Sequence, residues 1–70
     1  MTPNQEENLI KLQKTYLMLQ GQRKIVERIY EKTNPMAVYI TKKLDEHLFK
    51  LDSWINTIED MIKNLLKQAA

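Results

Sequence analysis

One interruption near the middle of the chain most constrains its fold, the tripeptide Thr33-Asn34-Pro35. The residue before a proline is driven out of the α region, so a helix that starts near the N-terminus should end by Thr33. Asn34 is a good N-cap, and Pro35 suits the first position of a second helix. The tripeptide therefore predicts a turn between two helices.

Apolar residues repeat at steps of three and four on both sides of this turn, which is the spacing of one helix face. In the first segment the repeat comprises Leu9, Leu12, Tyr16, Leu19, Val26 and Tyr30, with Arg23 as its one polar member. In the second segment it comprises Ile40, Leu44, Leu48, Leu51, Ile55, Ile58, Ile62, Leu65 and Ala69. We expect one all-α domain over 1–70, with helices at about 3–33 and 35–68 and a turn at 33–35. The short link makes them an antiparallel hairpin.

Local signals support the first helix and leave one alternative open. Thr2, Pro3 and Gln5 form the capping-box pattern of a helix start. Gly21 weakens a helix interior and could mark a bend or a split into two shorter helices. The pair Asp52-Ser53 could cap a third helix, but the unbroken apolar repeat around it favours two helices.

Composition removes several classes of function. The chain of 70 residues has no cysteine and one histidine, so disulfides, thiolate metal sites and multi-histidine zinc sites are excluded. We expect no metal and no cofactor of the protein's own. A net charge of +2, spread along the chain, does not indicate nucleic-acid binding. The polar N-terminus and the absence of a long apolar run predict a cytoplasmic protein without a membrane segment.

The helices carry more apolar surface than one neighbour can cover. Leu17, Ile25 and Ile29 form a second line on the first helix, and Trp54, Met61 and Leu66 widen the apolar face of the second. We expect two hairpins to pair as a four-helix bundle, a homodimer, with a protein partner as the alternative cover. Leu48, Ile55, Trp54 and Met61 are the predicted core or dimer residues. His47, which shares a heptad position with Trp54 and Met61, should lie at the edge of the core.

Four residues of the second helix form the most informative polar group. At about 100° per residue, Thr41, Asp45, Phe49 and Asp52 lie on one side of the helix, beside the apolar repeat. This places two carboxylates, a hydroxyl and an aromatic ring on one accessible ridge. The spacing alone is equally that of a solvated side of a helix with one exposed phenylalanine.

The stretch from Lys24 to Leu48 resembles the small sporulation-regulating aspartyl-phosphate phosphatases of Gram-positive spore formers. Those proteins are helical hairpins with a Ser-Gln-Glu-Leu-Asp run in the second helix, shortly after the turn. The matching run here is Thr41-Lys42-Lys43-Leu44-Asp45. Lysines replace the glutamine and the glutamate, a departure that bears on partner choice and on activity.

This resemblance implies dephosphorylation of a sporulation response regulator, with the receiver domain of the regulator as partner and any Mg²⁺ bound by that partner. It makes Asp45 the candidate catalytic residue and Thr41 its supporting hydrogen-bonding group. Lys42 becomes a candidate partner contact, and helical geometry adds Phe49 and Asp52. The alternative is a non-catalytic helical module that blocks a regulatory protein. A phosphatase needs the Asp45 carboxylate, whereas a blocker should depend on apolar anchors.

Overall fold

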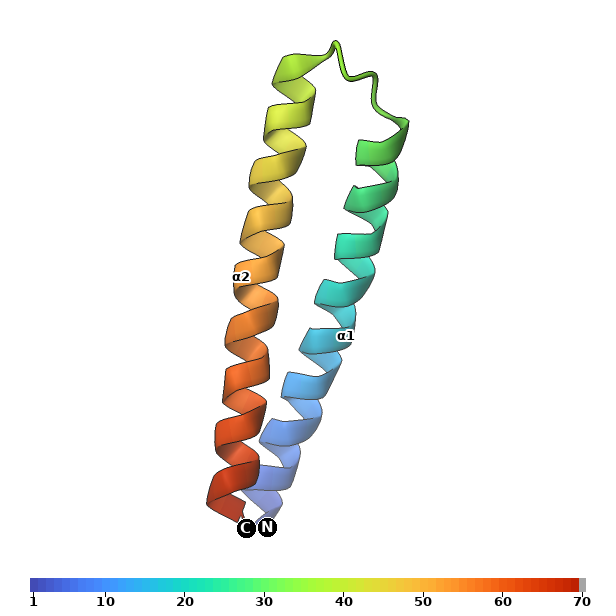
Figure 1. The fold of residues 1–70 in the computed structure, drawn as a ribbon. Coiled ribbons are helices and arrows are strands. Elements are labelled where there is room, and N and C mark those ends of the chain that lie inside the picture. The colour runs from blue at the N-terminus through green and yellow to red at the C-terminus, as the bar shows by residue number, and fades with distance from the viewer. Residues whose placement is uncertain (70) are drawn as a thin grey trace.

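The protein is an antiparallel pair of long helices, seen in a computed structural model that describes residues 1–69 (Figure 1). Helix α1 spans Pro3–Lys32 and helix α2 spans Val38–Ala69. The rod measures 53 × 14 × 13 Å along its principal axes, and both chain ends lie at the end opposite the turn. The predicted all-α hairpin is confirmed. Helix α1 continues through Gly21, and α2 continues through Asp52 and Ser53.

The start of α1 has the capping box that its sequence predicts. The backbone N–H of Gln5 donates to Thr2 Oγ1 at 3.2 Å, and the backbone N–H of Thr2 donates to Gln5 Oε1 at 3.0 Å. Pro3 occupies the first helical turn, where its missing N–H costs no hydrogen bond. At the other end, Thr33 caps α1: its hydroxyl donates to the carbonyl of Ile29 at 2.6 Å.

The second helix begins at Val38, so the predicted start at Pro35 is wrong. Asn34 caps a turn and not a helix: its Oδ1 accepts from the N–H of Met36 at 2.9 Å, and its carbonyl accepts from the N–H of Ala37 at 2.9 Å. Pro35 and Met36 are therefore the central residues of a β-turn, in which proline presets the first backbone angle. Asparagine followed by proline suits both the start of a helix and the start of a β-turn, so the sequence alone does not distinguish the two.

The core of the hairpin lies in the middle of the rod. Leu19 and Val26 of α1 and Leu51 and Ile55 of α2 are buried, and Leu51 is 0% exposed. Partly buried side chains pack against this core, namely Tyr16, Leu44, Leu48 and Ile58. Of the residues predicted for the core or a dimer interface, Ile55 is thus buried, and Leu48 packs against the core while partly exposed.

The apolar repeat does not pack along the whole rod. Ile40 is 51% exposed and Tyr30 is 37% exposed, although both continue the repeat toward the turn. In Figure 1 the two helices separate toward the turn. The repeat positions near the turn therefore remain more exposed than those in the middle of the rod.

Candidate protein-binding flank of the second helix

The four residues Thr41, Asp45, Phe49 and Asp52, here called the Asp45 flank, lie on one side of α2. Leu44 and Leu48 pack toward the core and so fix the rotation of this part of the helix. As a result Asp45 is exposed and Phe49 is 73% exposed. The structure thus combines a carboxylate and an unusually exposed aromatic ring one helical turn apart on a rigid element.

Asp45 is open to an external partner. Within residues 1–69, the ion pairs and side-chain hydrogen bonds of the hairpin do not include its carboxylate. Its neighbour Lys43 lies 3.7 Å from Glu46, and the Lys43 ammonium lies 5.7 Å from the centre of the Tyr39 ring. Lys42 is exposed as well.

Thr41 has its hydroxyl engaged by the backbone at the start of its own helix. Its hydroxyl donates to the carbonyl of Ala37 at 3.0 Å, so the proton is already engaged by the backbone. The side chain is half-buried and, together with Tyr30 and Pro35, lines a depression near the turn. The hydroxyl oxygen keeps its capacity to accept a hydrogen bond.

Asp52 is held inside the hairpin by an arginine from the other helix. The Nε of Arg23 lies 2.5 Å from Asp52 Oδ1, and the same guanidinium pairs with Glu27 one turn farther along α1. The hydrogen bond with Asp52 raises the pKa of Arg23, with a smaller opposing effect of desolvation. Arg23 is the one polar residue in the apolar repeat of α1, and carboxylates of both helices hold its guanidinium. A charged residue within the apolar repeat is the feature of the sequence that points to a partner in the other helix.

A second polar contact joins the helices on the same side. The hydroxyl of Tyr16 donates to Glu59 Oε1 at 3.2 Å and accepts from Gln20 Nε2 at 3.0 Å. Sequence reasoning placed Tyr16 in the core and missed this link, because nothing local pairs it with a residue of the other helix.

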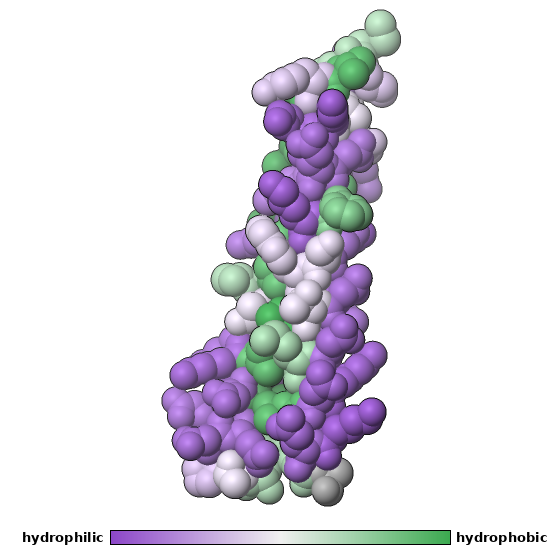
Figure 2. Space-filling model, turned by 90° about the vertical axis from the view of Figure 1, so that its left-hand side faces the viewer, coloured by the Kyte–Doolittle hydropathy of each residue, from purple (hydrophilic) through white to green (hydrophobic). Residues whose placement is uncertain are grey.

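The remaining predicted residues lie outside the hairpin core. Trp54 is 51% exposed and Met61 is 49% exposed. His47 is exposed, so its expected place at the edge of the core is wrong. Figure 2, which faces the α2 side, shows hydrophobic side chains at the surface between hydrophilic ones.

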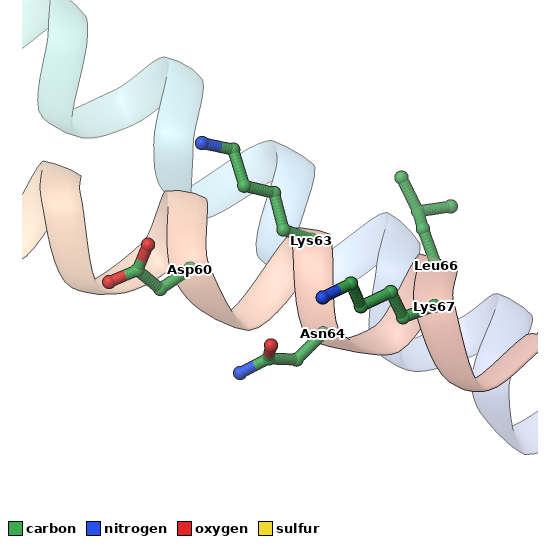
Figure 3. A pocket seen from close by; sticks show the side chains of 5 residues that line it. All are labelled: Asp60, Lys63, Asn64, Leu66 and Lys67. Carbon is green, nitrogen blue, oxygen red and sulfur yellow. The ribbon is translucent and has the colours of Figure 1, made fainter.

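The concave features of this surface are shallow. One depression is lined by five residues that all project from the last turns of α2, Asp60, Lys63, Asn64, Leu66 and Lys67 (Figure 3). Since one helix supplies the whole lining, it cannot enclose a small molecule. Within residues 1–69, no three His, Asp or Glu side chains are grouped to hold a metal, and neither helix is long and apolar enough to cross a membrane.

Comparison with protein-family models, with curated proteins and with solved structures gives no match to this chain.

Proposed function

We propose that this protein, acting as a homodimer, removes phosphate from the receiver aspartate of a sporulation response regulator. The observation that carries the proposal is the setting of Asp45, an exposed carboxylate on a helix whose rotation Leu44 and Leu48 fix. A reacting group on a rigid element keeps its geometry better than one on a loop. The resemblance of the run from Thr41 to Asp45 supplies the substrate class.

The reaction requires little chemistry from a helper protein. Water attacks the phosphorus, the bond from phosphorus to the carboxylate oxygen of the regulator breaks, and inorganic phosphate leaves. The receiver domain supplies the Mg²⁺ and the acidic pocket, so this chain needs no cofactor of its own. Asp45 accepts a hydrogen bond from the water and holds it in line with the breaking bond.

The neighbours of Asp45 have separate roles in this proposal. Phe49 is the apolar anchor on the receiver domain, because its ring is 73% exposed one turn from Asp45. Lys42 adds an exposed charge to the contact. Thr41 supports the site as an acceptor, since its proton is bound to Ala37. Asp52 keeps the docking role more weakly, because Arg23 already holds its carboxylate.

The test compares the phosphate lifetime of receiver domains from a Gram-positive spore former, labelled with radioactive acetyl phosphate. Wild-type protein should shorten that lifetime, and Asp45→Asn should reduce the acceleration by about a hundredfold, the scale of one positioned proton-transfer or water-orienting group. Thr41→Ala should have a smaller effect in the same direction. Asp60→Asn is the matched control: it removes the same charge from an exposed position of the same helix, about 22 Å farther along the axis.

A non-catalytic binding module is the second candidate, favoured by the exposed ring of Phe49 and by the engagement of Asp52 with Arg23. This module would bind a receiver domain without changing its phosphate lifetime, and Phe49→Ala would weaken binding while Asp45→Asn would not. If the wild-type protein shortens the phosphate lifetime of none of the receiver domains tested, or if Asp45→Asn is as active as wild type, the phosphatase proposal fails. The protein is then a non-catalytic binding module.

A further inference from the structure

The hairpin is too thin to bury its own apolar side chains. Its solvent-accessible surface is 5648 Å² for a mass of 8.4 kDa. A compact monomer of that mass exposes about 4,600 Å². The excess of roughly 1,000 Å² is close to the area of about 800 Å² that each partner loses in a stable protein–protein interface.

The exposed apolar residues are not spread evenly around the rod. The contacts of Arg23 with Asp52 and of Tyr16 with Glu59 fix which sides of the helices lie together. At about 100° per residue, these contacts mark one long side of the rod, which also contains the Asp45 flank. The opposite long side, here called the Trp54 face, presents Met18, Ile25, Ile29, Trp54 and Met61.

A surface depression shows that Met61 lies on this opposite side. Met61 of α2 shares a surface depression with Asn8 and Lys11 of α1, residues that do not belong to the Arg23–Asp52 side. Met61 is seven residues after Trp54, two helical turns away on the same stripe. The Trp54 face therefore spans both helices and is not a feature of α2 alone.

Charge distinguishes the two sides. Along the middle of the rod the Trp54 face includes Thr15, Gln22 and His47 between its apolar residues, with Lys50 at its edge and with Lys11 and Lys43 toward its ends. The side of the Asp45 flank carries Glu27, Glu31, Asp45, Asp52 and Glu59, and Arg23 pairs with two of these carboxylates. A two-fold axis brings each surface against itself, so the side with five carboxylates would bury more charge than the middle of the Trp54 face.

We propose that the Trp54 face is the interface between two copies of this chain, which pack as a four-helix bundle. The area in excess of a compact monomer, the span of the face over both helices and its apolar middle all fit a second copy. Because this face and the Asp45 flank lie on opposite sides of the rod, the dimer leaves both Asp45 carboxylates accessible. Under the proposed function, one dimer then serves two receiver domains.

The test uses the wild-type chain without any regulator, so its outcome is independent of phosphatase activity. Sedimentation equilibrium at tens of micromolar should give the mass of a dimer. Trp54 is the one tryptophan of the sequence, so its fluorescence reports this face alone. The emission should lie at short wavelength in the dimer and move to longer wavelength on dilution, in step with the fall in mass.

Two variants make the assignment specific. Trp54→Glu introduces a charge at a position that the single hairpin leaves half exposed, and it should abolish the dimer mass. Phe49→Glu places the same charge at the exposed aromatic of the opposite side and should leave the dimer intact. If Trp54→Glu is unfolded, the wild-type fluorescence decides. A monomer mass for wild type, or a dimer whose Trp54 emission stays solvent-like, would overturn the proposal.

Discussion

Leu51 is the side chain on which hairpin stability should depend most. It is 0% exposed and belongs to the buried core together with Leu19, Val26 and Ile55. Leu51→Ala removes three carbon atoms, worth about 0.8 kcal/mol each in transfer free energy, or about 2.4 kcal/mol. The cavity left behind adds to this, within the range of about 2–5 kcal/mol for buried leucine. A two-layer structure relaxes easily around a cavity, so we expect about 3 kcal/mol.

That loss is large for a chain of this size. At roughly 0.05–0.15 kcal/mol per residue, 70 residues give a free energy of unfolding of about 3.5–10 kcal/mol. The melting temperature should fall by about 12–24 °C at 4–8 °C per kcal/mol. Thermal and urea unfolding, followed by far-ultraviolet circular dichroism at one fixed protein concentration, measures both quantities.

The matched control is Leu17→Ala, the same substitution at a leucine that is 69% exposed on α1. It should change the free energy of unfolding by no more than about 0.5 kcal/mol. Equal losses for the two variants, or a loss below about 0.5 kcal/mol for Leu51→Ala, would refute the conclusion that the packed middle of the rod holds the helices together.

Three further predictions concern the helices and the contact between them. Gly21→Ala should stabilise the protein by about 1 kcal/mol, because a helix interior favours alanine over glycine by that amount and no atom lies within 4 Å of the added Cβ. A higher melting temperature checks this, and a lower one would mean that the outer side of α1 is covered. Asp52→Asn should lower the urea midpoint of unfolding slightly and reduce its dependence on salt, because Arg23 then loses its charged partner in the other helix. In the wild type, the contact with Asp52 raises the pKa of Arg23 in the folded chain, so it stabilises the fold at pH values below the pKa that Arg23 has in the unfolded chain. This stabilisation is lost only as the pH rises through the higher pKa of Arg23 in the folded chain. The titration of Arg23 should therefore not lower the free energy of unfolding between neutral and moderately alkaline pH. A decrease in this free energy over that range that is seen in the wild type and is absent in Asp52→Asn would contradict the prediction.

The candidate site was predictable in part. The spacing of Thr41, Asp45 and Phe49 placed them on one side of a helix, because side-chain direction in a helix follows from sequence position. The engagement of the Thr41 hydroxyl with Ala37 depends on a local rotamer, which the sequence does not specify. The use of Asp52 by Arg23 depends on the other helix, so only the packed hairpin could reveal it.

The sequence by itself determined the two helices, the cap at Thr2 and the buried positions of Leu19, Leu51 and Ile55. These follow from interactions within a few residues and from an apolar repeat that has only one other helix to pack against. The tertiary structure decided where α2 begins, because Asn34 can cap a turn or a helix with equal chemistry. It also decided that Tyr30 and Ile40, which continue the apolar repeat toward the turn, stay exposed, because burial depends on how closely the two helices pack at that end.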